Sequence, residues 1–559
     1  MTSPRLELVW PGKDKFLLVP KDETGKPVWV KRDHPAASEV RLTDVTGSVG
    51  EVPAEPLDAN LLFTGDSLDV LRVLTEVPEY RSRYRGKVKL VYIDPPFNTG
   101  QAFEHYDDWM EHSTWLSFMR ERLLLIRELL APDGLIFLHL DNFEVHRMRL
   151  LMDEVFGAGQ HLASVAWQRT SAKTLARLTL GTMHETLLTY GRSPESSLAP
   201  LFLDLDPDYV TKRYKNADGR GRFDTGDLTA SSHRPHLDSG KPWHGHDPSE
   251  KRRCWAVPRA PLEEIGLTDA ELSQMTMREK LDALDDHGYI YWPANGGFPR
   301  LKKYLSRSRG RAVGDLWTDL TVINSQAAER SGFSTQKPEV LIERVLSLGT
   351  RPGDIVLDCF AGSGTTAAVA HKMGRRWVTA EILPSTVEQF TQPRLIKVVN
   401  GEDPGGITKT ADWQGGSGFL TVTVGPSMYE DTPYGVVLAD WARGERFARA
   451  VAGQLGFSWQ RDAQPLCGIR GRMRLAVLDG AVGPEEVRAI VGALAEKERV
   501  TIVATSVLPE AEETLAEVSK GSRIRKAPRD LLTSGSLRVR RRTEASERMP
   551  ARDVGGSPS

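Results

Sequence analysis

The sequence of 559 residues predicts an α/β fold with a mostly parallel, layered sheet, and three observations lead to this prediction. Apolar runs with the length of buried strands alternate with segments whose apolar residues recur at three- and four-residue steps. One such run, Val88 to Ile93, is stopped by Pro95 and Pro96, because proline donates no hydrogen bond to a sheet. Another strand-like run is followed by a glycine-rich turn and a helix pattern. The chain is too long for one core, so we expect two to four domains.

The first half of the α/β pattern begins near Asn60. A long helix is expected from about Trp109 to Leu130, because Leu116, Met119 and Leu123 continue one apolar face through its length. The remaining expected elements of this half are strands at 61–63, 88–93, 134–140, 163–167 and 186–190 and helices at 67–74 and 143–156.

The pattern is interrupted from about Gly191 to Gln326 and resumes at Pro338. The interruption is rich in Pro, Gly, Asp, His and Arg, and long loops of this kind inside a domain are usually functional. The resumed part predicts helices at 338–348, 365–373 and 385–398 and strands at 354–357 and 376–382. One sheet should therefore be interrupted by an insert.

The two ends of the chain differ from this core. Residues 1–57 predict an irregular arm or lid, and a Gly-rich linker after 400 leads to strands at 474–478 and 500–504 around a helix at 484–497. The expected division is an arm at 1–57, core halves at 58–190 and 331–400 around an insert at 191–330, a small C-terminal α/β domain at 401–535, and a disordered tail at 536–559.

Composition excludes several classes of protein. Cys254, Cys359 and Cys467 are far apart and form no Cys-x-x-Cys pair, which argues against disulfides and a zinc site and fits a reducing cytoplasm. The first ten residues contain no apolar signal core, and no stretch is long enough to span a membrane. We expect no metal and a cytoplasmic location.

Basic residues gather in the insert although the formal net charge of the chain is −2. Aromatic residues such as Tyr214, Trp255 and Tyr304 lie among them, which favours nucleic acid over a purely solvated surface. Residues 300–311 could contact phosphates or form a solvated helix face, and both alternatives stay open. The candidate DNA contacts are Lys212, Arg213, Lys215, Arg300, Lys302, Lys303 and Arg307.

Asp94, Pro95, Pro96 and Phe97 form the first motif that carries chemistry. They place a carboxylate, a rigid turn and an aromatic ring at the C-terminal end of a strand, where open α/β sheets bind ligands. Asp94 and the Pro95 carbonyl can accept the two hydrogens of an exocyclic amine, and Phe97 can stack on its ring. The motif therefore suits a flat heterocycle with an amino group.

The second motif is the turn from Asp358 to Gly364 between a strand and a helix. Gly362 and Gly364 permit a tight turn and close approach of a ligand, and Glu381 ends the next strand, where it can accept hydrogen bonds from ribose hydroxyls. The sequence matches neither the dinucleotide pattern nor the phosphate loop of ATP-driven motors. A nucleoside without phosphates remains, with a purely structural turn as the alternative.

Both motifs resemble those of the amino-methyltransferases of DNA. Their order, with the catalytic motif before the S-adenosylmethionine motif, resembles the β class and most closely the Mod subunits of type III restriction–modification systems and their stand-alone relatives. Similar strings extend the resemblance over roughly residues 58–400: Phe63-Thr64-Gly65-Asp66, Asn98-Thr99-Gly100 and Ser334-Thr335-Gln336-Lys337-Pro338. It implies a Rossmann-like methyltransferase sheet with circularly permuted motif order and a target-recognition domain in the insert.

The resemblance also implies roles for single residues. Gln336 and Lys337 should hold the methionine end of S-adenosylmethionine, with Asp66 near the same pocket. Asp358 should order the glycine loop or meet the cofactor amine, and Phe360 should pack beside the cofactor. Lys337 could equally be a surface charge at a helix start.

The expected function is site-specific transfer of a methyl group from S-adenosylmethionine to N6 of a flipped adenine in duplex DNA, as part of a restriction–modification or phage-defence system. The alternatives are an RNA adenine-N6 methyltransferase and a non-catalytic DNA-specificity subunit. Cytosine-C5 transfer is excluded because no cysteine follows a proline, and N4 transfer is disfavoured because that family usually has serine in place of Asp94. The resemblance further implies a homodimer and a helicase–nuclease partner.

Overall fold

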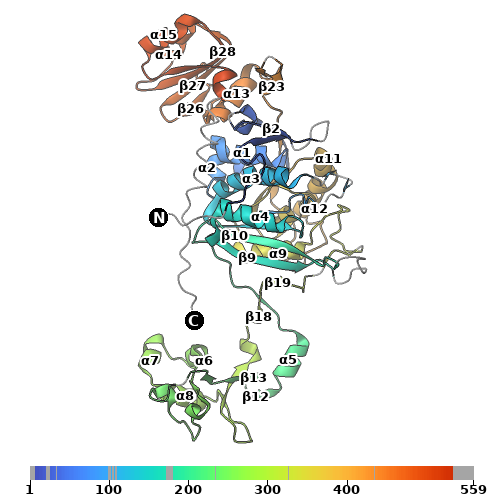
Figure 1. The fold of residues 1–559 in the computed structure, drawn as a ribbon, viewed down its shortest axis with the longest axis vertical. Helices are drawn as coiled ribbons and strands as arrows, with labels where there is room; N and C mark the ends of the chain where they lie inside the picture. Colours follow the sequence, from blue (N-terminus) through green and yellow to red (C-terminus); the bar gives the residue numbers. More distant parts are fainter. Residues whose placement is uncertain are drawn as a thin grey trace. The chain divides into compact units, whose positions relative to one another are not determined.

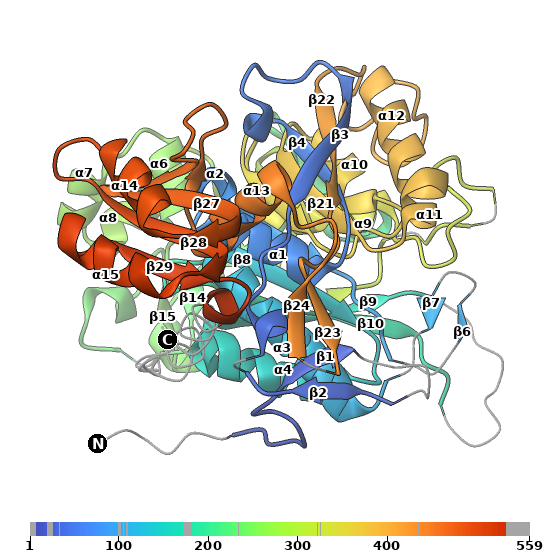
Figure 2. The same ribbon diagram turned by 90° about the horizontal axis from the view of Figure 1, so that it is seen from above.

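The computed structural model describes residues 7–19, 26–32, 34–98, 102–103, 106–107, 110–170, 180–232, 234–320, 322–324, 326–433 and 435–532. These residues form two compact units, the first within Met1–Ala199 and Gly314–Ser559 and the second within Pro200–Val313. Figures 1 and 2 show the helices and strands of both units. The tail expected to be disordered, 536–559, lies outside the described residues.

A ten-stranded sheet forms the centre of the first unit. Strands β8, β5, β20, β21, β4 and β22 run parallel, while β10 and β3 run antiparallel to their neighbours. This arrangement confirms the predicted α/β fold with a mostly parallel sheet. In spatial order the strands are β19 (Leu316–Trp317), β9 (His161–Gln168), β10 (His184–Gly191), β8 (Leu130–Leu140), β5 (Val88–Ile93), β20 (Ile355–Asp358), β21 (Arg376–Glu381), β4 (Asn60–Thr64), β22 (Gly418–Val424) and β3 (Thr43–Gly50).

The chain leaves β5 and β20, which are neighbours in the sheet, in opposite directions. From β5 it passes through α3 (His112–Leu129) to β8, and from β20 it passes through α10 (Thr365–Lys372) to β21. Because such crossovers are right-handed, the two helices lie on opposite faces of the sheet. The loops after β5 and β20 therefore diverge, and this divergence opens a crevice at the carboxyl edge of the sheet.

Helices pack on the sheet as the apolar periodicity predicts. Leu116, Met119, Leu123 and Ile126 of α3 are all buried. The expected helix at 385–398 is instead divided into α11 (Pro384–Thr386), a π-helical turn (Val387–Thr391) and α12 (Gln392–Asn400). The other helices of this core are α1 (Ser67–Glu76), α2 (Pro78–Tyr84), α4 (Val145–Met152), followed by a π-helical turn (Asp153–Gly157), and α9 (Glu339–Gly349).

The sheet extends beyond the core expected from the sequence. Strands β1 (Phe16–Val19) and β2 (Val28–Val30) form a two-stranded sheet of their own, and β3 is the edge strand of the central sheet rather than part of an irregular arm. Its polar sequence and exposed positions, such as Val45, gave no signal of burial. Strand β22, directly after the Gly-rich linker, inserts between β3 and β4.

A small α/β sheet follows β22, as expected from the sequence. Strands β27 (Met473–Val482) and β28 (Arg499–Val507) are parallel and are linked by α14 (Pro484–Gly492), and Figure 1 shows this region in orange and red. Gln454 accepts a hydrogen bond from the backbone of Val40 at 2.7 Å, so the N-terminal region contacts it. Its other elements are β23 (Tyr429–Thr432), β24 (Gly435–Leu438), α13 (Gly444–Leu455), β25 (Ser458–Trp459), β26 (Gly468–Arg470), α15 (Pro509–Val518) and β29 (Arg523–Lys526).

The second unit, Pro200–Val313, has a hydrophobic core of its own that includes Phe223, Trp243 and Trp255. Residues 300–304 form a strand, so the suggestion of a solvated helix face at this place is wrong. Its main sheet has the order β12 (Asn216–Asp218), β13 (Gly221–Asp227), β17 (Arg300–Tyr304) and β16 (Ile290–Tyr291), and its helices are α5 (Pro207–Arg213), α6 (Arg259–Glu264), α7 (Asp269–Gln274) and α8 (Met277–Asp286). A target-recognition role for this unit stays a prediction.

No helix among the described residues has the length and apolar character that crossing a membrane would require.

Candidate active site

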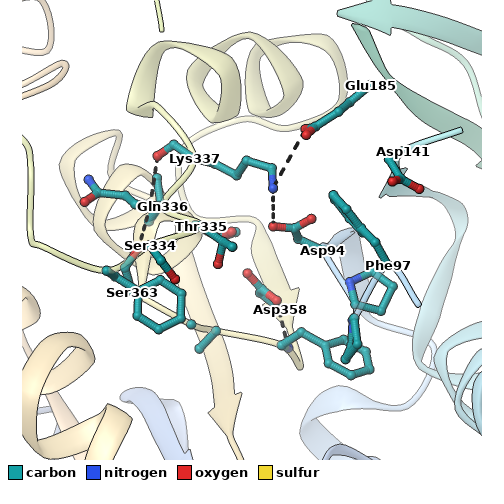
Figure 3. A pocket seen from close by; sticks show the side chains of 18 of the residues that line it. Asp94, Phe97, Asp141, Glu185, Ser334, Thr335, Gln336, Lys337, Asp358 and Ser363 are labelled. Carbon is teal, nitrogen blue, oxygen red and sulfur yellow. Dashed lines mark hydrogen bonds and ion pairs between the residues drawn. The ribbon is translucent and has the colours of Figure 1, made fainter. Parts of the chain in front are cut away.

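The catalytic and glycine-rich motifs line one cavity of about 1390 Å³ in the first unit. The cavity lies at the crevice where the loops after β5 and β20 diverge, and Figure 3 shows a close view of it. All four residues from Asp94 to Phe97 contribute to its wall, as do the predicted cofactor residues Asp66, Gln336, Lys337, Asp358, Phe360, Gly362 and Glu381. Gly364 lies at the N-cap of α10 and does not itself line the cavity, although its neighbours Ser363 and Thr365 do.

The turn after β5 is held in place by contacts on both sides of its prolines. The Trp115 indole N–H donates to the Pro96 carbonyl at 2.8 Å. Asn98 has a φ of +60°, which few residues other than glycine adopt. This conformation is stabilised because the buried Asn98 amide donates to Glu144 at 2.7 Å and accepts from the Met110 N–H at 2.6 Å. The position of the catalytic motif is therefore fixed by its own packing.

The Asp94 carboxylate has one engaged oxygen and one orphaned oxygen. Its Oδ2 accepts a hydrogen bond from Lys337 Nζ at 2.6 Å. Its Oδ1 is buried and has no hydrogen-bond partner among the residues that the structure describes. Lys337 Nζ also lies 4.9 Å from the centroid of the Phe97 ring. An unpaired buried acceptor is costly, so it points to an absent donor.

The glycine-rich turn depends on two left-handed backbone conformations. Gly362 and Gly364 have φ values of +48° and +76°. A Cβ on Gly362 would lie 3.1 Å from the Phe333 ring, and one on Gly364 would lie 3.0 Å from Thr391. The Gly362 carbonyl accepts from the Thr391 hydroxyl at 2.6 Å. Side chains are therefore disfavoured here both by conformation and by space.

Two carboxylates beside this turn are held in a setting that disfavours negative charge. Burial, together with the nearby Asp94 and Glu381 charges, raises the pKa of Asp358 to about 7. Burial also raises the pKa of Glu381, although its carboxylate accepts from the Gly362 and Leu383 N–H groups at 3.0 and 3.1 Å. A bound cation would relieve both carboxylates.

S-adenosylmethionine fits the chemistry of this cavity. It carries a sulfonium and an ammonium group, and a positive charge beside Asp358 and Glu381 would stabilise these carboxylates, whose pKa values are raised in its absence. It has no phosphates that would need a basic loop. The turn at Gly362 lets a ligand approach the backbone closely. Phe360, whose ring centroid lies 6.2 Å from that of Phe118, adds an apolar surface to the wall.

Besides Lys337, which pairs with Asp94, two further predicted cofactor residues have other partners. Gln336 accepts from the backbone and the hydroxyl of Ser331, both at 2.7 Å, and donates to the Glu329 carbonyl at 2.6 Å. Asp66 caps α1 and forms an ion pair with Arg122 at 2.8 Å. Both residues border the cavity, but these contacts give them a part in shaping its wall. A direct contact with the cofactor stays a prediction for each.

A buried polar chain beside Asp94 was not found from the sequence. The Glu185 carboxylate lies 3.9 Å from Lys337 Nζ and 2.9 Å from His139 Nε2, and His139 Nδ1 lies 2.8 Å from the Tyr92 hydroxyl. Burial raises the pKa of Glu185, but the Lys337, His139 and Arg169 charges outweigh it and hold the pKa well below its usual range. The available signal was a polar residue, His139, inside the apolar run of β8.

The candidate DNA contacts all lie in the second unit, where several form ion pairs. Their N–O distances are 2.9 Å for Arg213–Asp224, 3.1 Å for Arg300–Asp227, 2.9 Å for Lys302–Asp218 and 3.8 Å for Arg307–Glu264. Solvent-exposed pairs of this kind contribute little to stability. Contact of these residues, and of Lys212, Lys215 and Lys303, with DNA stays a prediction.

Comparison with known proteins agrees with the motifs. The chain is 27% identical over 381 residues to the type II methyltransferase M.EcaI of Enterobacter cloacae, covering 67% of this chain and 74% of that protein. It is 29% identical over 348 residues to the type III restriction-modification enzyme StyLTI Mod subunit of Salmonella typhimurium, covering 55% of this chain and 49% of that subunit. The chain thus spans about half the length of this Mod subunit.

A solved structure and a family model also match. The PvuII DNA methyltransferase, described as cytosine-N4-specific, aligns with a TM-score of 0.33 and 14% identity, covering 63% of this chain and 90% of that one. The model of the N6_N4_Mtase family, described as DNA methylase, matches residues 88–392, which include both motifs and the insert between them. The chain therefore belongs to the N6_N4_Mtase family of DNA methylases.

Proposed function

We propose that the protein transfers a methyl group from S-adenosylmethionine to N6 of an adenine at a specific site in duplex DNA. The observation that carries the proposal is the single cavity lined by the Asp94 turn and the Gly362 loop. A carboxylate at position 94 favours adenine-N6 over cytosine-N4, because N4 enzymes usually have serine there. Membership of the family is compatible with either amine.

The cofactor would be held by the glycine-rich side of the cavity. Gly362 admits it close to the backbone, Glu381 is placed to accept its ribose hydroxyls, and Asp358 offsets its positive charge. When bound, S-adenosylmethionine supplies an electrophilic methyl group. Because one cavity would hold both reactants, their placement would supply much of the rate enhancement.

The catalytic turn would activate the base. An exocyclic amine is a poor nucleophile because its lone pair is delocalised into the ring. Acceptance of its two hydrogens by the Asp94 carboxylate and the Pro95 carbonyl favours a more tetrahedral nitrogen and frees that lone pair. These groups are preorganised for the charge that develops in the transition state. Phe97 would stack on the base and hold its plane.

The target amine lies inside a duplex, so the base must be flipped out at a cost of about a few kcal/mol. The basic and aromatic residues of the second unit would offset this cost through contacts with the phosphates and grooves of the DNA. The matched relatives are named as methyltransferases and as Mod subunits of restriction–modification enzymes. We therefore propose that the chain is the modification component of such a system. The family resemblance further suggests a homodimer that can join a helicase–nuclease subunit.

The test is modified-base sequencing of DNA from a host that expresses either the wild type or Asp94→Ala. We expect N6-methyladenine at one sequence in the wild type and none in the variant, while the affinity for DNA is retained. Glu496→Ala, at a side chain that is 91% exposed, is the control and should methylate normally.

Three results would contradict the proposal. They are N4-methylcytosine as the product, turnover by Asp94→Ala, and preference for RNA of matched sequence over duplex DNA.

A further inference from the structure

Lys337 forms an ion pair with Asp94, the carboxylate that the proposed reaction needs. Its ammonium pairs with Asp94 Oδ2 at 2.6 Å, and the other oxygen, Oδ1, is buried. One acceptor of Asp94 is therefore neutralised and the other is closed to solvent. The carboxylate can meet a base amine with its full negative charge only after Lys337 withdraws, although Oδ1 is the oxygen left without a donor among the described residues.

Lys337 also covers the ring on which the base would stack. Its Nζ lies 4.9 Å from the centroid of Phe97. An ammonium over a ring face is attracted to it, and a base stacking there would have to displace the ammonium. The same side chain thus blocks both contacts that the catalytic motif offers to a base.

A second carboxylate can receive the ammonium. Glu185 Oε2 lies 3.9 Å from Lys337 Nζ, and Figure 3 shows the Lys337 side chain reaching toward both Asp94 and Glu185. Glu185 is 3% exposed and stands at the start of β10, on the opposite side of Lys337 from Asp94. Rotation about the side-chain bonds of Lys337 is enough to exchange one partner for the other.

The surroundings keep Glu185 ready for this exchange. Arg169 donates to its Oε1 at 2.8 Å, and His139 Nε2 lies 2.9 Å from its Oε2. These groups and Lys337 hold the pKa of Glu185 below its usual range although burial raises it. The carboxylate therefore stays ionised, and a buried ionised carboxylate attracts a nearby ammonium strongly.

We propose that Glu185 is a positioning residue that draws Lys337 away from Asp94 when the target base enters, so that Asp94 and Phe97 become free to bind the base. This inference rests on the proposed methyl transfer to an exocyclic amine. The Lys337 ammonium remains ion-paired with one carboxylate throughout, and the amine of the base replaces it as the partner of Asp94. Glu185 also lines the cavity, and in this proposal it acts through Lys337 rather than on the base or the methyl donor directly.

The first test is Glu185→Gln, which keeps the shape of the side chain and removes its charge. Lys337 then stays on Asp94, and we expect kcat to fall about tenfold or more, while the KM for S-adenosylmethionine changes less than about twofold. Glu343→Gln is the matched control, because Glu343 lies on α9, just after Lys337, but does not line the cavity. It should leave turnover unchanged. Normal turnover by Glu185→Gln would overturn the inference.

A second test separates positioning from simple structural support. Because Glu185 acts through Lys337, adding Glu185→Gln to Lys337→Gln should lower kcat by less than twofold further. Fully multiplicative losses would overturn the inference. If Glu185→Gln does not fold, Glu185→Asp is the deciding variant. A shorter carboxylate should draw Lys337 less effectively and lower kcat below that of wild type, and wild-type turnover would refute the inference. If the wild type transfers no methyl group, both the proposed function and this inference fail. If the wild type is active, the results with the variants test the role of Glu185 alone.

Discussion

The raised pKa of Asp358 makes the stability of the protein depend on pH in a defined direction. The carboxyl has an ordinary pKa of 3.8 and a pKa of about 7 in the folded protein. Between these values the folded state binds more protons than the unfolded state, so the free energy of unfolding falls as the pH rises. The stabilisation that the raised pKa of Asp358 gives to the folded state is fully present below pH 4 and lost above pH 7.

The size of this effect follows from the two pKa values. One decade in an acid dissociation constant corresponds to about 1.4 kcal/mol, so the contribution amounts to at most about 4 kcal/mol. Asp358→Asn removes the titration and keeps an oxygen that can accept from the Phe360 N–H, which now donates to Asp358 at 2.9 Å. Relative to wild type, the variant should therefore gain stability as the pH rises from 4 to 8.

The measurement is urea unfolding of wild type and Asp358→Asn across this pH range, with Asp440→Asn at an exposed position as control. The difference between variant and wild type cancels the titration of buried acids that are not coupled to Asp358, such as Glu39. Binding of S-adenosylmethionine to wild type, but not to Asp358→Asn, should tighten as the pH rises toward 7. Parallel stability curves for the two proteins would refute the reasoning.

Three further predictions concern other parts of the molecule. Gly362→Ala forces alanine into a φ of +48° at a cost of about 1–2 kcal/mol and places a methyl group 3.1 Å from Phe333, so calorimetry should show weaker binding of S-adenosylmethionine. Lys372→Met removes a buried ammonium that pairs with Glu339 at 2.8 Å and with Asp403 at 2.9 Å, which leaves Arg394 as the cation beside Glu339. The variant should lower the unfolding free energy by about 3–5 kcal/mol in urea, and an unchanged midpoint would contradict this. The affinity for duplex DNA should fall linearly with salt concentration on a double-logarithmic plot, measured by fluorescence anisotropy, and a flat plot would argue against phosphate contacts.

The two motifs could be predicted from the sequence because proline and glycine restrict the local backbone conformation in known ways. Pro95 and Pro96 must end a strand, and Gly362 marks a turn that other residues avoid, so both strand ends could be located. The order of motifs and the family resemblance then suggested that the two ends meet, and the structure brings both to one cavity. The family match confirms the resemblance.

Long-range pairing could not be read in the same way. Glu185 reaches Lys337 only because β10 pairs antiparallel with β8, with Leu187 opposite His139. Nothing in the sequence around Glu185 specifies that register. Strand β3 is similar, because its polar, exposed residues become a strand only through pairing with β22, which lies hundreds of positions later.

The arrangement of β3 and β22 has a practical consequence for fragments of this protein. A fragment of residues 58–400, the limits suggested by the sequence pattern, would lose both strands. The buried Asn60–Thr64 strand would then become an uncovered edge strand of the sheet. Uncovered edge strands of this kind pair with strands of other molecules and promote aggregation. We expect such a fragment to precipitate.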